Sequence, residues 1–143
     1  MYDCRRCRLE FNVNLSANAW PWPIKLSTSE LRGLIEDFSD EKLAEFIAGE
    51  IDGDGAVWFG YEGVSVEIAA CKNCQKSFTL DVLRRVIAER FNIISHMYLT
   101  KTVNVIRFYG ESAVKLLRLV MPYLHHPLRR LRAEVILAYY EVG

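Results

Sequence analysis

The sequence lacks the features by which secreted and membrane-spanning proteins are recognised. It contains no run of about 18 apolar residues, the length that a membrane-spanning helix requires. Its first residues, MYDCRRCRLEF, carry charges where a signal peptide would have an apolar segment. We therefore expect an intracellular protein without a membrane partner.

A net charge is also missing, because 18 Lys and Arg residues balance 18 Asp and Glu residues. Taken alone, this balance argues against a protein that binds nucleic acid. The charges are unevenly distributed, however. Residues 1–62 hold 6 basic and 12 acidic residues, whereas residues 63–143 hold 12 basic and 6 acidic residues. Scattered surface charges produce such a difference as well, but it suits a fold with one basic face.

Cysteine is scarce, and the four cysteines form two Cys-x-x-Cys pairs, Cys4/Cys7 and Cys71/Cys74. Two such pairs are able to bind zinc, although the 63 residues between these pairs exceed the usual spacing of a zinc site. Disulfide bonds are the second interpretation, and they are unusual inside cells. Free thiols are the third. The sequence leaves the three open.

What is present is enough for one domain with an apolar core, since 51% of the 143 residues are hydrophobic. Ser27-x-x-Glu30 is a capping box that starts a short helix ending near Asp37. Alternating apolar residues predict a hairpin over residues 57–70 and a second over residues 93–109. Helical periodicity predicts helices over residues 40–52, 78–91, 111–123 and 127–140.

One short segment is more specific than these patterns. Residues 47–55 read IAGEIDGDG and follow the apolar start of a predicted helix. They resemble the LAGLIDADG motif of homing endonucleases, with six of the nine positions identical. Glu50 departs from the pattern because the family has an apolar residue there.

This resemblance implies the α+β fold of that family, with the element order αββαββα. The order predicted above agrees with it over about residues 40–140. We therefore expect a LAGLIDADG endonuclease domain at residues 39–143. Residues 1–38, an arm and a short helix, form an N-terminal extension outside the minimal fold of the family.

The resemblance also implies a metal site at the end of the motif. The family's metal-binding carboxylate corresponds to Asp54, and the carbonyl group that precedes it belongs to Gly53. Mg²⁺ suits such hard oxygen ligands and retains waters for hydrolysis of a phosphodiester. Asp52 is expected to support the turn.

Because the motif occurs once, the resemblance implies a homodimer in which two copies of the motif helix pair. The residues expected at this interface share one stripe of the helix: Ala44, Ile47, Ala48 and Ile51. Ordinary core packing within one chain is the alternative reading of this stripe.

Basic and amide side chains near the scissile phosphate are further family features. The positions that match them here are Lys72, Gln75 and Lys76 after the first hairpin, and Arg129 in the segment HHPLRR. The usual family lysine in that last segment has no clear equivalent, so a histidine or Arg129 is expected to replace it.

A two-stranded ribbon fits the major groove of DNA, and Lys or Arg residues contact the phosphates. The DNA-binding residues expected on the strands and near them are Glu62, Glu67, Lys72, Lys76, His96, Tyr98, Lys101, Asn104, Arg107 and His126.

The predicted function is therefore that of an intron-encoded homing endonuclease. It would be a Mg²⁺-dependent homodimer that cuts a long, nearly palindromic site in double-stranded DNA. An RNA-binding intron maturase and a non-cleaving DNA-binding module of the same fold are the alternatives. Intact Asp54 favours cleavage.

Overall fold

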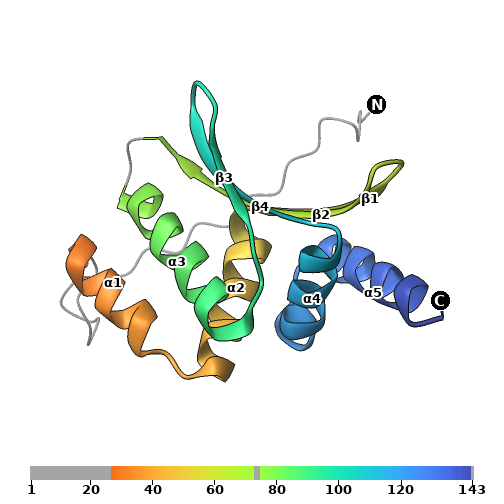
Figure 1. Ribbon diagram of the computed structural model, residues 1–143. Helices are drawn as coiled ribbons and strands as arrows, with labels where there is room; N and C mark the ends of the chain where they lie inside the picture. Colours follow the sequence, from red (N-terminus) through yellow and green to blue (C-terminus); the bar gives the residue numbers. More distant parts are fainter. Residues whose placement is uncertain (1–26, 73–74, 143) are drawn as a thin grey trace, which may run out of the picture.

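The computed structural model describes residues 27–72 and 75–142 and shows four antiparallel strands with helices on one face (Figure 1). The strands are β1 (Gly55–Gly60), β2 (Gly63–Cys71), β3 (His96–Leu99) and β4 (Val103–Tyr109), in the spatial order β1-β2-β4-β3. The helices are α1 (Thr28–Asp37), α2 (Asp40–Asp54), α3 (Gln75–Phe91), α4 (Glu111–Val120) and α5 (Pro127–Val142). This arrangement confirms the expected α+β class and the order αββαββα from α2 to α4.

The motif helix α2 runs beneath the sheet, where it contacts β1, β2 and α4 (Figure 1). It begins at the N-cap Ser39, whose hydroxyl accepts a hydrogen bond from the backbone N–H of Lys42 at 3.2 Å. Its apolar stripe packs under β1 and β2, where Val57, Val66 and Ile68 point down and are fully buried. This packing therefore fixes the position of α2 relative to β1 and β2.

Helix α1, the helical part of the expected N-terminal extension, packs against the rest of the described structure. It lies against α3, and its Ile35 is only 1% exposed. Arg90 of α3 donates hydrogen bonds to the carbonyl groups of Glu36 and Phe38 and lies 3.5 Å from Asp40. A cation at the C-terminal end of a helix compensates for unpaired carbonyl groups, so Arg90 holds α1 in place.

Several element boundaries differ from the sequence prediction by two or three residues. Helix α4 ends at Val120, and a 3-10 turn, η3 (Met121–Tyr123), contains Pro122, whose ring is incompatible with a helix interior. Helix α3 begins at Gln75 rather than at residue 78. Among the described residues, no helix has the length and apolar character needed to cross a membrane.

The passage from α2 into β1 depends on Gly55. A Cβ atom there would lie 2.5 Å from the Cα of Ile51 and 3.0 Å from the carbonyl oxygen of Glu67. Both neighbours are backbone atoms, which a side-chain rotation does not move. The glycine at the end of the motif is therefore required by a close approach of α2 to the sheet.

We predict that Gly55→Ala destabilises the protein by at least about 2 kcal/mol, because the helix and β2 must separate to admit a methyl group. Gly33→Ala in α1 is the matched control, since nothing lies within 4 Å of its added Cβ. That control is expected to gain about 0.5–1 kcal/mol from helix propensity. Urea unfolding of the two variants measures the difference, and equal stability would contradict the close approach.

Candidate functional site

The motif carboxylate Asp54 is the last residue of α2, and its side chain is exposed, as is Gly53 before it. The C-terminal end of a helix carries a partial negative charge, and the last turn of α2 contains no basic residue. A carboxylate at this position adds to the negative potential. The expected metal ligands, Asp54 and the Gly53 carbonyl group, therefore lie together at a helix end of negative potential, and their binding of a metal ion stays a prediction.

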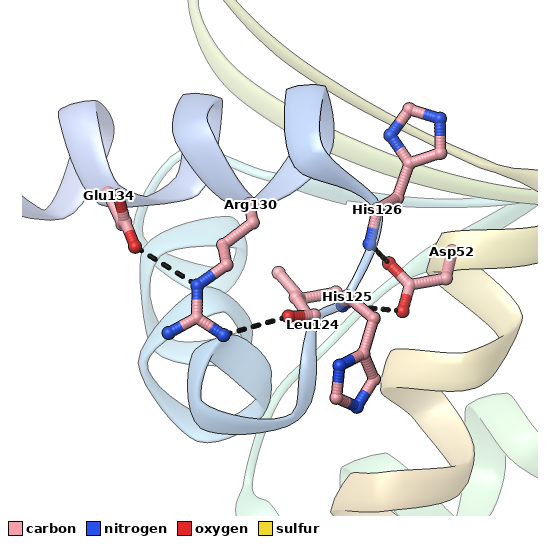
Figure 2. A network of polar contacts seen from close by, with 6 residues as sticks. All are labelled: Asp52, Leu124, His125, His126, Arg130 and Glu134. Atoms are coloured by element: carbon pink, nitrogen blue, oxygen red, sulfur yellow. Dashed lines mark hydrogen bonds and ion pairs between the residues drawn. The ribbon is translucent and has the colours of Figure 1, made fainter.

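Asp52, two residues earlier, holds this end of the helix to the loop before α5 (Figure 2). Its Oδ2 accepts the backbone N–H of His125 at 2.8 Å, and its Oδ1 accepts that of His126 at 3.0 Å. Both carboxylate oxygens are thus engaged with backbone donors. This arrangement agrees with the expectation that Asp52 supports the turn. We call the contacts of Asp52 with this loop and with Arg129 the α2 clasp.

Arg129 forms the other side of the α2 clasp, because its Nη1 donates to the backbone carbonyl oxygen of Asp52. The backbone N–H of Arg129 in turn donates to Nδ1 of His126 at 3.3 Å, so this histidine caps the first turn of α5. Arg129 is half-buried and its guanidinium group contacts the motif helix. Its contact in the structure is with the protein, and a role at the phosphate stays a prediction.

The loop itself is held from the side of α5 by Arg130 (Figure 2). Its Nη1 donates to the carbonyl oxygen of Leu124 at 2.9 Å, and its Nε lies 3.1 Å from Oε1 of Glu134. The rings of His125 and His126 point away from the carboxylate of Asp52 (Figure 2). The clasp thus uses backbone groups, and the proposed DNA contact of His126 stays a prediction.

The other basic positions expected near the phosphate are placed only in part. Lys72 follows β2 and is exposed, and its backbone N–H donates to the carbonyl oxygen of Thr102 at 3.1 Å. The side chains of Gln75 and Lys76 lie outside the described part of the structure. Their expected roles remain predictions.

Three of the expected DNA-binding residues form one cluster on the sheet face opposite the helices. Arg107 of β4 donates its Nε to Oε1 of Glu67 on β2 at 2.5 Å and its Nη2 to the hydroxyl of Tyr98 on β3 at 3.1 Å. The hydroxyl of Tyr98 donates to Oε1 of Glu67 at 3.2 Å, which closes the triangle. Three strands are therefore joined by one set of polar contacts.

The cluster keeps its two donors protonated. Burial, followed by the nearby Glu67 carboxylate, raises the pKa of the Tyr98 hydroxyl above its ordinary value. The hydrogen bond to Glu67 raises the pKa of Arg107 in the same way. At neutral pH the cluster therefore presents a neutral phenol and a guanidinium group whose charge is balanced by Glu67.

The remaining residues expected to contact DNA lie at different places on the sheet. Glu62, in the turn between β1 and β2, is exposed, as are His96 on β3 and Lys101 between β3 and β4. Asn104 is a correction: it is only 9% exposed, and its Nδ2 donates to Oγ of Ser77 on the helix side. Asn104 and Arg107 are an odd number of residues apart, so they point to opposite faces of β4.

The residues expected at a dimer interface occupy the core of a single chain. Ala44, Ile47, Ala48 and Ile51 are at most 2% exposed, because the stripe that they form faces the sheet and α4. Their side chains are therefore not available to a second chain. Gly49 and Gly53, which lie elsewhere around α2, are exposed, and nothing lies within 4 Å of a Cβ placed at either position.

The cysteines are mostly outside the described residues, which include Cys71 but not Cys4, Cys7 or Cys74. Cys71 takes part in a disulfide bond. Among the described residues, no group of three or more His, Cys, Asp and Glu side chains is placed to hold a metal ion. The structure therefore gives no support to the zinc interpretation.

The contacts of the α2 clasp were not predicted from the sequence, because the residues that make them are far apart in the chain. Asp52 and His125 are separated by 73 positions, and the loop contributes backbone N–H groups rather than recognisable side chains. The one available signal is Pro127, which marks the first turn of a helix and hence unpaired N–H groups before it.

We predict that Asp52→Ala lowers the free energy of unfolding by about 2–3 kcal/mol, because two backbone N–H groups lose a charged acceptor. Glu45→Ala, which removes an exposed carboxylate from the same helix, serves as the control and is expected to change stability by less than about 0.5 kcal/mol. Guanidinium unfolding monitored by circular dichroism gives both values. Equal stability of the two variants would show that the clasp does not hold α2.

Comparison with known proteins identifies the fold through structure and not through sequence. No protein-family model matches the chain, and no curated protein sequence matches it. The homing endonuclease I-CvuI in complex with its target Sro1.3, in the presence of 2 mM Ca, matches with a TM-score of 0.58 and 18% identity. That match covers 71% of this chain and 68% of the other.

A second structure of I-CvuI, in complex with the I-CreI target C1221 in the presence of 2 mM Mg and with the DNA not cleaved, has a TM-score of 0.52. It is 17% identical and again covers 71% of this chain and 68% of the other. The chain therefore has the fold of the homing endonucleases, and the LAGLIDADG resemblance of residues 47–55 is confirmed at the level of the fold.

Proposed function

We propose that the protein is a site-specific endonuclease that cuts both strands of DNA as a metal-dependent homodimer. The observation that carries this proposal is the position of Asp54, an exposed carboxylate at the end of a helix that the α2 clasp holds in place. The fold shared with an endonuclease solved in complex with its DNA target supports it.

Asp54 and the carbonyl group of Gly53 would hold the metal ion in each chain. These are hard oxygen ligands, and their exposure leaves room for water and for phosphate oxygens, which matches the preference of Mg²⁺. When bound, the metal would supply an activated water and stabilise the leaving oxygen of the phosphodiester. The protein's own part is to hold the carboxylate at a fixed point beneath the sheet.

One chain contributes only one such carboxylate. Within the described residues, no group of three acidic, histidine or cysteine side chains surrounds Asp54 to complete a site. A second copy placed about a twofold axis beside α2 would bring a second Asp54 close to the first. Repulsion between the two carboxylates would then be relieved by the cation.

Gly49 and Gly53 are the positions on α2 that suit this pairing. They are exposed, are four residues apart on one side of the helix, and have open space where a side chain would be. Small residues at such spacing allow two helix backbones to approach closely. The homodimer interface is therefore proposed along these glycines rather than along the buried stripe.

The outer face of the sheet is proposed to contact the DNA. The cluster of Glu67, Tyr98 and Arg107 lies on its middle strands, and its preformed geometry suits contact with base edges. The exposed cations Lys72 and Lys101 lie at strand ends, where phosphate contacts are expected. Lys76, Glu62, His96 and His126 are proposed to make further contacts with the DNA.

Cleavage of a plasmid library with randomised inserts tests the activity. With Mg²⁺ we expect linear products that share one sequence class, because each half-site is bound by one sheet. Asp54→Asn is expected to abolish cutting while retaining binding to the selected sequence, because it removes a metal ligand without changing the sheet. Cutting by Asp54→Asn at an unchanged rate would contradict the assignment of the metal site.

The interface is tested by Gly49→Leu, which adds a side chain where the single chain has open space. We expect this variant to remain folded, to elute as a monomer and to lose double-strand cleavage. Glu89→Leu, at an exposed position of α3, is the control for added apolar surface away from the proposed interface. If Gly49→Leu remains a dimer by analytical ultracentrifugation, the pairing does not involve this part of α2.

A further inference from the structure

The outer face of the sheet is hollowed near the turn between β1 and β2. The hollow has a volume of about 430 Å³ and is lined by residues of β1, β2 and β4 and of the turn between β1 and β2. This volume lies within the range of small-molecule binding pockets. The hollow is open to solvent, and its lining residues Ser65 and Glu67 alternate along β2 with buried core residues, so it lies on the sheet face away from the core.

The register of the strands explains the hollow. Trp58 on β1 lies opposite Ser65 on β2, which lies opposite Tyr109 on β4. A small residue thus stands between two large aromatic residues in one row across the sheet. The adjacent pair towards the turn, Gly60 and Gly63, has no side chains to fill the space.

The two aromatic walls are exposed, with 56% of Trp58 and 45% of Tyr109 accessible to solvent. Neither residue belongs to the hydrophobic core. Each ring has a guanidinium group nearby, with Arg132 5.4 Å from the centroid of Trp58 and Arg107 5.8 Å from that of Tyr109. These cation–π contacts position the rings without covering the hollow.

The end of the hollow away from the turn is polar, because Glu67 and Arg107 also line it. Their contacts with each other and with Tyr98 use Oε1 of Glu67 and the Nε and Nη2 atoms of Arg107. Within the described part of the chain, Nη1 of Arg107 and Oε2 of Glu67 are engaged in none of these contacts. Arg107 thus brings donor groups, and Glu67 acceptor oxygens, to this end of the hollow.

We propose that this hollow binds one unpaired nucleobase of a single-stranded nucleic acid. Two aromatic walls offer stacking to the faces of a base, and stacking on aromatic side chains is the common means by which sheets bind single strands. The donor and acceptor at the polar end match the edge of a base that is free of its pairing partner. In a duplex, neighbouring base pairs cover the faces of each base and only the base edges are accessible. Duplex DNA is therefore not expected to stack on Trp58 and Tyr109.

The charges of the hollow favour a strand over a free nucleotide. Glu62 and Glu67 both line it, while Arg107 is the one cation that the described residues contribute to its lining and is paired with Glu67. The phosphate group of a free nucleotide would meet a net negative surface there. In a strand the phosphates run past the hollow while one base enters it. The inference does not depend on the proposed cleavage, since Asp54 has no part in it.

Binding is tested with the full chain carrying Asp54→Asn, so that cutting does not interfere. The probes are an end-labelled single-stranded DNA of 12 nucleotides, the RNA of the same sequence, the duplex, and a strand of the same length without bases. Fluorescence anisotropy compares Trp58→Ala and Tyr109→Ala with Trp58→Phe, which retains an aromatic wall. Phe78→Ala, which removes an exposed aromatic residue of α3, is the control.

We expect the alanine variants to weaken single-strand binding about 5- to 100-fold, which corresponds to the loss of one stacked base. Trp58→Phe is expected to restore most of it, and Phe78→Ala to leave it unchanged. The fluorescence of Trp58, observed in a Trp20→Phe and Trp22→Phe background, is expected to be quenched by the strand with bases and not by the strand without them.

Stronger binding of the RNA or of the DNA strand identifies which nucleic acid supplies the base, and either result supports the proposal. Equal binding of the strands with and without bases would overturn it, as would unchanged binding by Trp58→Ala. Duplex binding that Trp58→Ala and Tyr109→Ala weaken as much as single-strand binding would also overturn it, because the walls would then not distinguish an unpaired base. If the protein cuts duplex DNA but the fluorescence of Trp58 is not quenched, the proposed function stands and the proposed base-binding site is wrong.

Discussion

The hydrogen bonds between the carboxylate of Asp52 and the loop before α5 are the contacts on which the rest of the site depends. They join the C-terminal end of the motif helix to a segment 73 positions away, at distances of 2.8 and 3.0 Å. Arg129 adds a contact to the backbone carbonyl group of the same residue. Because Asp54 is only two residues further on, its position follows from this attachment.

The two aspartates of the motif, Asp52 and Asp54, differ in their surroundings. Asp52 is used by the protein itself, since both its oxygens accept backbone N–H groups. Asp54 is exposed at the end of the helix dipole, where negative potential accumulates. Gly55 then brings the chain into β1 by an approach that a methyl group would prevent. Asp52 therefore serves attachment and Gly55 serves close packing, while Asp54 is the residue proposed to bind the metal ion.

Much of the fold was predictable from local patterns in the sequence. The alternation of apolar residues over residues 57–70 predicted the first hairpin, and the capping box that begins at Ser27 marked the start of α1. These signals are local, since a cap or an alternating strand depends on residues within a few positions. The motif supplied the one long-range expectation, that of the fold itself.

What the sequence did not predict depends on contacts between distant segments. The apolar stripe of α2 was assigned to an interface, but a helix under a sheet needs that stripe for its own core. Asn104 was placed on the outer face, although its register opposite Ala70 turns it toward the helices. The hollow between Trp58 and Tyr109 arises from the register of three strands, which no single segment encodes.

The proposal that one chain holds half of a metal-dependent site is tested most directly with mixed dimers. Intact chains and Asp54→Asn chains with different tags are combined, and the dimers carrying both tags are isolated and given supercoiled plasmid with the selected site. The proposal predicts nicked circles, because one strand is cut and the other is not. Linear product formed by mixed dimers at the rate of the intact protein would contradict it, since a single Asp54 would then suffice for both strands.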